Sequence, residues 1–209
     1  MNSLEQQRFY SGRFDNANLS VLPSLNPDST ILNCENNNLT ELPHPLPSRI
    51  QQLRCFFNKI QHINDLNYLN ELFELNCSHN LLTKLPLLPS SIIMLYCSNN
   101  FITEIDLRYL NNNNLQNNDF LTNNLKIVYC NKNKLNLLYL SNTVNTVVCS
   151  NNFLTSLILP NNIITAHCNN NKINEIIIQS NNLRKLNCSK NFLNKLTNFP
   201  DSLIELNIA

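Results

Sequence analysis

A phrase of about 20 residues, built around a cysteine and an asparagine, recurs along most of this 209-residue chain. Residues 75–85 read LNCSHNLLTKL, residues 95–105 read LYCSNNFITEI and residues 186–196 read LNCSKNFLNKL. The spacings between successive cysteines are 21, 22, 20, 33, 19, 19 and 20 residues. The eight cysteines are Cys34, Cys55, Cys77, Cys97, Cys130, Cys149, Cys168 and Cys188. A period this regular predicts a solenoid, in which each repeat forms one coil and packs only against its neighbours.

The repeat has a defined consensus when positions are counted from each cysteine as zero. Position +3 is asparagine in all eight copies, and positions +5 and +8 hold only leucine or isoleucine. Position −2 is leucine or valine in every copy except one, which has Ala166. The unit L-x-x-L-x-C-x-x-N-x-L-x-x-L resembles the leucine-rich repeat. Proline-rich text after position +8, such as LPHPLP at 42–47, makes it similar to the short LPX-type repeats of bacterial effectors, and leucine-rich-repeat proteins of large DNA viruses look similar.

The resemblance implies a curved right-handed coil, with a parallel β-sheet on its concave face and short irregular or turn-like connections on its convex face. We expect a short N-terminal segment at 1–11, followed by a single leucine-rich-repeat domain over 12–209. This domain would hold about eight full repeats, partial repeats at both ends and an insertion at about 106–124, inside the 33-residue spacing. The text NDLNYLNELFEL after Ile63 is the best candidate for a short helix, with Asn64 or Asp65 as its N-cap.

The spacing of cysteine and asparagine, which is the same in every copy of the repeat, has a structural interpretation. Alternate side chains of a strand point to opposite faces, so positions −2 and zero should point into the coil, and positions −1 and +1 should point outward. We therefore interpret the cysteines as buried structural thiols, with a metal or redox role as the alternative. The +3 asparagines should satisfy backbone groups that are freed where each strand ends. Because Gly12 is the single glycine of the chain, asparagine should also occupy left-handed backbone positions.

Composition and motifs narrow the class of function. The sequence has no phosphate-binding loop, HExxH or GxSxG motif, and Cys168 should point away from its neighbour His167, so we expect no enzyme, no cofactor and no metal. A net charge of +1 without basic blocks argues against nucleic acid as a partner. No apolar run is long enough for a membrane helix, and the N-terminus does not resemble a signal peptide. We expect an intracellular, cytoplasmic protein, located in the host cytoplasm if it comes from a pathogen or virus.

The exposed side of the sheet is then the expected functional surface. Aromatic residues and arginine are the usual anchors of protein interfaces, and here they stand among small polar residues. Tyr96 and Tyr129 should be neighbours, because they flank the insertion on successive coils. The candidate partner-binding residues are Arg54, Phe56, Met94, Tyr96, Ile127, Tyr129 and His167.

The resemblance and the exposed surface together predict a non-enzymatic protein–protein interaction module, a pathogen or viral protein that binds host proteins. The alternative is the substrate-recognition part of a ubiquitin-ligase-type effector that lacks its catalytic domain. Leu206 and Ile208 begin a further strand whose free edge could also pair with a second copy of the chain.

Overall fold

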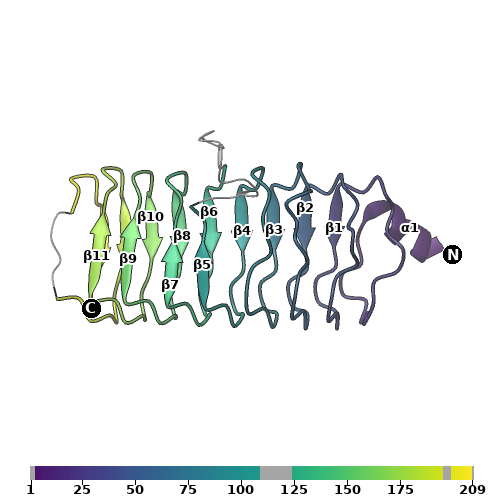
Figure 1. Cartoon of the computed structure of the whole chain (residues 1–209), viewed down its shortest axis with the longest axis horizontal. Coiled ribbons are helices and arrows are strands. Elements are labelled where there is room, and N and C mark those ends of the chain that lie inside the picture. Colours follow the sequence, from purple (N-terminus) through teal and green to yellow (C-terminus); the bar gives the residue numbers. More distant parts are fainter. Residues whose placement is uncertain (1–2, 109–123, 195–198, 209) are drawn as a thin grey trace, which may run out of the picture.

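The chain forms a solenoid of parallel strands, which stack side by side along its long axis (Figure 1). The computed structural model describes residues 3–108, 124–194 and 199–208. One strand from each successive coil contributes to a nine-stranded parallel sheet. Its strands, in spatial order, are β1 (Ile31–Asn33), β2 (Gln52–Arg54), β3 (Glu74–Asn76), β4 (Met94–Tyr96), β6 (Ile127–Tyr129), β8 (Thr146–Val148), β10 (Thr165–His167), β12 (Lys185–Asn187) and β13 (Glu205–Asn207). The predicted leucine-rich-repeat coil with its parallel sheet is confirmed.

The register of the sheet aligns equivalent positions of every repeat. Leu75 of β3 pairs with Leu53 of β2 on one side and with Leu95 of β4 on the other, and all three are fully buried. Each of the strands from β1 to β12 in this sheet is followed at once by its cysteine, so the apolar residues and the cysteines form parallel columns inside the coil. Full burial of one leucine side chain contributes about 1.5–3 kcal/mol. The core is therefore a set of continuous apolar columns.

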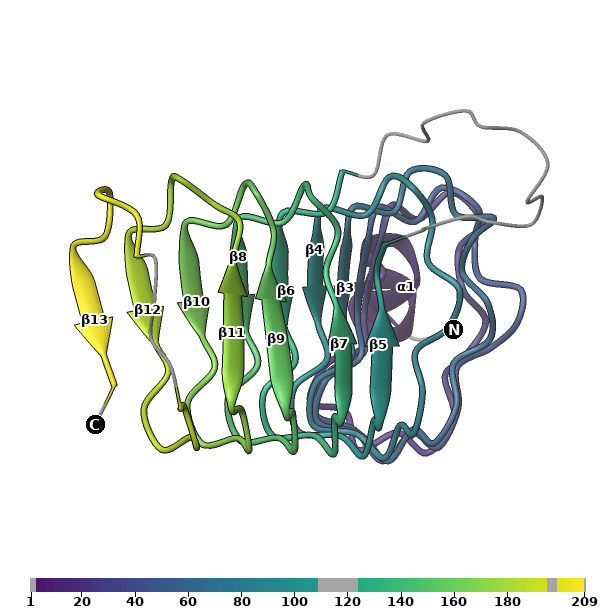
Figure 2. The same ribbon diagram turned by 60° about the vertical axis from the view of Figure 1, so that its left-hand side comes forward.

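A second set of short strands lies on the opposite side of the coil in the C-terminal half (Figure 2). Strands β5 (Glu104–Asp106) and β7 (Leu137–Tyr139) form one parallel pair, and β9 (Ser156–Leu159) and β11 (Glu175–Ile178) form another. The N-terminal coils have irregular connections on this side, as expected. Their connections are rich in proline, which has no backbone N–H to donate to a β-ladder. The later coils carry apolar β-branched text such as EIII, which favours strands.

The short helix predicted around Asp65 is wrong. The segment instead forms tight turns in which the Leu69 and Leu72 N–H groups donate to the carbonyls of Leu66 and Leu69, at 2.9 and 3.0 Å. All three leucines are buried, because a spacing of three residues places each of them toward the core. The Asp65 carboxylate does not cap a helix, since its Oδ1 accepts the N–H of Leu87 in the next coil at 3.0 Å. Contacts between coils therefore override the local helix propensity.

The N-terminal segment contains a helix that the sequence analysis did not predict. Helix α1 (Ser3–Ser11) lies at one end of the solenoid (Figure 1). It ends at Gly12, whose φ is 64° and whose N–H donates to the Arg8 carbonyl at 2.9 Å. The Gly12 carbonyl then accepts the N–H of Asn33 at 2.8 Å, which joins the end of the helix to β1. Gly12 thus ends the helix and attaches it to the first full coil.

The predicted insertion at about 106–124 overlaps residues 109–123, which lie outside the described residues. Before this segment, strand β5 ends at Asp106. After it, Lys126 directly precedes strand β6. Strands β4 and β6 pair directly across this interruption, so the nine-stranded sheet is continuous.

Candidate partner-binding face

The +3 asparagines form a hydrogen-bonded column that joins neighbouring coils. The Nδ2 atom of Asn100 donates to the Cys77 carbonyl at 3.0 Å and to the Cys97 carbonyl at 3.1 Å. Its Oδ1 accepts the N–H of Leu82 at 2.9 Å. Equivalent bonds recur at Asn58, Asn80, Asn133, Asn152, Asn171 and Asn191. The interpretation of these asparagines as satisfying freed backbone groups is confirmed.

The eight thiols are free and buried, as interpreted from the sequence. Burial raises the pKa of the Cys77 thiol to about 12, and it also raises the pKa of Cys168. A nucleophilic cysteine needs an accessible thiolate, so these thiols are unsuited to that chemistry. Among the described residues, no group of three or more histidine, cysteine or acidic side chains is arranged to hold a metal ion.

Left-handed backbone, for which the sequence analysis expected asparagine, recurs at position +2 of the repeat. All eight +2 residues have positive φ, and four of them are not asparagine: Phe57, His79, Lys132 and Lys190. The geometry keeps the ladder intact through the turn, because the His79 N–H still donates to the Ser98 carbonyl of the next coil at 2.8 Å. The Phe57 and His79 rings stack with centroids 4.0 Å apart. This aromatic contact was missed, because only asparagine was considered for such positions.

Tyr96 and Tyr129 are neighbours on the outward face of the nine-stranded sheet, as predicted. They occupy paired positions of β4 and β6, and their rings stack with centroids 5.2 Å apart and planes 18° apart. Met94 and Ile127 are paired beside them, and the Tyr96 hydroxyl donates to the Met94 sulfur at 3.6 Å. Partial burial and the nearby charge of Glu74 raise the pKa of Tyr96, so its phenol is neutral at physiological pH. We call Met94, Tyr96, Ile127 and Tyr129 the tyrosine patch.

Arg54 is held by an internal ion pair that the sequence analysis missed. Its Nε and Nη2 atoms donate to the two carboxylate oxygens of Glu74 at 2.8 and 3.0 Å, a bidentate arrangement. Glu74 is buried, and it pairs in register with Met94 of the tyrosine patch. The hydrogen bond to Glu74 raises the pKa of Arg54 further. Arg54 therefore borders the patch through Glu74, but its guanidinium is already engaged within the protein.

Phe56 and His167, the other two candidates, lie apart from the tyrosine patch. The Phe56 ring contacts Phe57, with centroids 5.6 Å apart. His167 lies two strands beyond Tyr129, because Val148 of β8 pairs with both. The structure thus brings four of the seven predicted residues into one patch and places Arg54 at its border.

Comparison with solved structures identifies the fold. YopM from Yersinia enterocolitica WA-314 superposes with a TM-score of 0.80 at 27% identity, over 94% of this chain and 40% of that one. YopM from Yersinia pestis, a leucine-rich effector protein, gives a TM-score of 0.72 at 28% identity, over 97% and 61%. This chain is a leucine-rich-repeat protein. No protein-family model and no curated protein matches its sequence.

This leucine-rich-repeat protein is shorter than the YopM chains, and another solved structure with the same fold also contains a column of cysteines. This chain spans 40% and 61% of the two YopM chains. A domain of InlJ from Listeria monocytogenes, which includes a cysteine ladder, shares the fold with a TM-score of 0.65 at 22% identity, over 90% of this chain and 46% of that one. These neighbours are repeat folds of the kind that typically serve as protein-interaction modules.

The opposite side of the leucine-rich-repeat protein carries a second exposed apolar row. Tyr139, Ile158 and Ile177 stand on β7, β9 and β11, and each is more than a third exposed. The Arg108 guanidinium lies 4.1 Å from the centre of the Tyr139 ring and is ion-paired with Asp106. This row faces away from the nine-stranded sheet, so it provides a control surface for the tyrosine patch.

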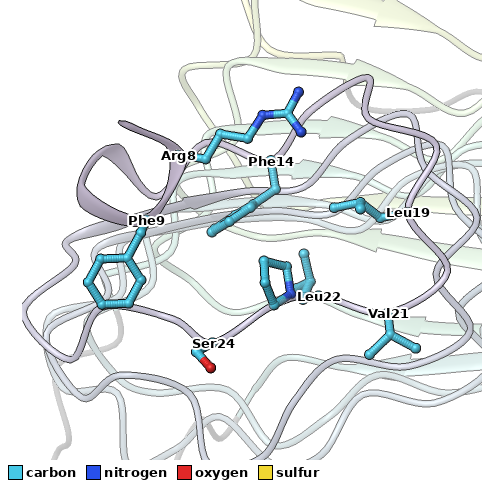
Figure 3. A pocket seen from close by; sticks show the side chains of 8 residues that line it. Arg8, Phe9, Phe14, Leu19, Val21, Leu22 and Ser24 are labelled. Carbon is cyan, nitrogen blue, oxygen red and sulfur yellow. The ribbon is translucent and has the colours of Figure 1, made fainter. Parts of the chain in front are cut away.

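A cavity of about 370 Å³ lies between α1 and the first coil (Figure 3). Its lining residues are Arg8, Phe9, Phe14, Leu19, Val21, Leu22, Pro23 and Ser24. Apart from Arg8 and Ser24 these side chains are apolar, and none is a general acid or base for chemistry near neutral pH. Among the described residues, no helix is long and apolar enough to cross a membrane.

Proposed function

We propose that this leucine-rich-repeat protein is a non-enzymatic module that binds a partner protein on the outward face of its nine-stranded sheet, centred on the tyrosine patch. The observation that carries the proposal is the stacked Tyr96–Tyr129 pair, flanked by Met94 and Ile127 on one continuous surface. Aromatic side chains that are held rigid by packing lose little conformational freedom on binding, and they dominate interface energetics.

The surroundings of the patch support binding rather than catalysis. Arg54 and Glu74 neutralise each other, and the thiols nearest to the patch are buried beneath the sheet. Serine hydroxyls beside the patch are already bonded, since Ser98 Oγ donates to the Asn131 Oδ1 atom at 2.6 Å. Affinity should therefore come mainly from the aromatic and aliphatic surface of the patch.

The finer proposal is that the partner is a host protein and that this protein acts in the cytoplasm of a host cell as a pathogen or viral effector. Its similarity to two YopM structures, one of which is described as an effector, supports this proposal. In the alternative, the recognition part of a ubiquitin-ligase-type effector, the same face would hold the substrate.

The test is crosslinked affinity capture from host-cell lysate followed by mass spectrometry. Wild-type protein would be compared with a Tyr96→Ala/Tyr129→Ala variant and with a matched Tyr139→Ala/Ile158→Ala variant on the opposite side. The proposal expects a protein that is retained by the wild type and the matched variant but lost with the tyrosine variant. Equal retention by all three proteins would place the binding site elsewhere.

A further inference from the structure

Outward asparagines at position −1 close a short hydrogen bond to the backbone of their own coil. In three strands of the nine-stranded sheet, the asparagine Oδ1 accepts the backbone N–H at position +1, two residues later. The pairs are Asn33 with Glu35, Asn76 with Ser78 and Asn187 with Ser189, each with an N···O distance of 3.2 Å. An outward side chain reaches this N–H in every case, so the donor is directed toward the exposed face of the sheet.

Four consecutive strands between these coils lack that internal acceptor. Strands β4, β6, β8 and β10 carry Tyr96, Tyr129, Val148 and His167 at position −1. Within the described part of the chain, the backbone N–H groups at position +1 of the same coils donate to no protein acceptor. These groups belong to Ser98, Asn131, Ser150 and Asn169. A backbone donor without a partner favours an external acceptor, because leaving it unpaired costs free energy.

Two of these four donors belong to buried serines, but an acceptor on the outward face can still reach the N–H of such a residue. Ser98 and Ser150 are 7% and 6% exposed, and Ser189, which is 7% exposed, is nevertheless reached by the Asn187 side chain. Two further donors lie in the same row. The Oδ1 atoms of Asn131 and Asn169 accept serine hydroxyls at 2.6 and 2.7 Å, which leaves their Nδ2 groups directed to other acceptors.

The charge pattern of this donor row selects the ligand. None of the outward residues at positions −3, −1 and +1 of β4, β6, β8 and β10 is acidic, and the exposed Lys132 lies at the edge of the row. The nearest carboxylate beyond one end, Glu74, is paired with Arg54, and Glu205 beyond the other end is paired with Lys185, whereas Glu35 stands on β1, three strands away from β4. An incoming carboxylate would therefore meet amide donors without local repulsion.

We infer that this row of four amide groups binds side-chain carboxylates of an acidic segment in the partner protein, beside the tyrosine patch. The inference rests on the proposed function, because it specifies the chemistry of the partner on the same face. Strands about 4.8 Å apart place the four N–H groups along about 14 Å. Carbonyls on one side of an extended chain repeat every ~6.6 Å and fall out of step with that spacing, whereas side-chain carboxylates can adjust to it.

The direct test is a titration of ¹⁵N-labelled protein with a capped hexa-aspartate peptide, followed by amide NMR. The Ser98, Asn131, Ser150 and Asn169 amide protons should shift downfield and saturate together. The amides of Ser78 and Ser189 should stay in place, because asparagine already occupies them. An uncharged Gly-Ser hexapeptide should move none of these resonances. Hexa-aspartate shifts that spare the four amides, or that move all six alike, would overturn the inference.

Substitution at position −1 gives an independent test. Val148→Asn should supply the missing acceptor to the Ser150 N–H, as Asn76 does for Ser78, and should weaken hexa-aspartate binding by about tenfold, the equivalent of 1.4 kcal/mol. Val148→Ala is the matched control, because it also removes the valine but leaves the N–H open, so it should bind as the wild type does. Asn76→Val should expose one more donor and strengthen binding. Equal affinity of the Val148→Asn and Val148→Ala variants would refute the inference.

The two proposals fail in different ways. If the tyrosine variant loses its captured protein while hexa-aspartate leaves the four amides unmoved, the partner-binding face stands and the acidic ligand is wrong. If hexa-aspartate binds the row but capture does not depend on the tyrosine patch, the donor row stands and the aromatic anchor is wrong.

Discussion

Replacing Asn100 by alanine tests the hydrogen-bonded column that joins the coils. The side chain makes four buried hydrogen bonds: Nδ2 donates to the carbonyls of Cys77, Cys97 and Ser98, and Oδ1 accepts the N–H of Leu82. An intramolecular hydrogen bond contributes about 1 kcal/mol net, and a buried group left unpaired costs about 1–3 kcal/mol. We therefore expect Asn100→Ala to lower the free energy of unfolding by about 3 kcal/mol, a large share of the ~5–15 kcal/mol of a typical domain.

The effect should also be local, because coils of a solenoid contact only their neighbours. Urea unfolding followed by circular dichroism gives the global loss, and hydrogen exchange of the Leu82 amide gives the local one. A loss of 3 kcal/mol corresponds to exchange that is about 100-fold faster. Asn136→Ala is the matched control, because Asn136 is exposed and only its backbone N–H is bonded, to the Thr103 carbonyl at 2.9 Å. If the Asn100 and Asn136 variants unfold alike, or if the Leu82 amide keeps its protection, the column does not hold the coils together.

Three further perturbations test the ends, the core and the face. Gly12→Ala should destabilise the protein by at least about 2 kcal/mol, because φ is 64° and the new Cβ would lie 2.0 Å from the Ile31 carbonyl oxygen; an unchanged melting temperature would contradict this. Burial raises the Cys77 pKa from 9.0 to about 12, so the unfolded state loses its proton first, and stability should be complete below pH 9 and fall as the pH rises toward 12. Unfolding at pH 8 and pH 10 measures that decline, which should be smaller in Cys77→Ala. Arg54→Ala leaves the buried Glu74 carboxylate unpaired and should cost about 1–3 kcal/mol, given that Arg54 is partly exposed; adding Glu74→Gln should recover part of the loss.

The columns of the solenoid could be predicted from the sequence because the constraint repeats in every coil. Position zero, occupied by Cys97 in one coil, has the same buried environment in all eight coils. Its burial and the amide column at position +3 therefore produce a periodic pattern in the sequence. The tyrosine neighbours followed from the same logic, because register alone places Tyr96 beside Tyr129 once the 33-residue spacing is treated as an interrupted coil.

Structural features that occur only once in the chain leave no periodic pattern in the sequence, so they could not be predicted in this way. Helix α1 is a single short segment with no repeat to reveal it, and the predicted helix near Asp65 failed because bonds to the next coil decided the backbone there. The ion pair of Arg54 with Glu74 joins positions −1 and −3 of neighbouring coils, a diagonal contact that a column-by-column interpretation does not test. Treating cross-strand pairs between different positions as candidates would have found it.

Position −1 connects folding and recognition in this protein. Where it is asparagine, as at Asn76, its side chain accepts the backbone N–H at position +1 of the same coil, and that donor is no longer available to a ligand. Where it is tyrosine, valine or histidine, the same backbone donor is left for an external acceptor, and the side chain adds contact surface. Because the columns inside the coil are unaffected by this exchange, the pattern of asparagine and other residues at position −1 can vary along the sheet without altering the fold. The four open positions from Tyr96 to His167 then define the length of the segment that a partner must present, about 14 Å at a strand spacing of about 4.8 Å.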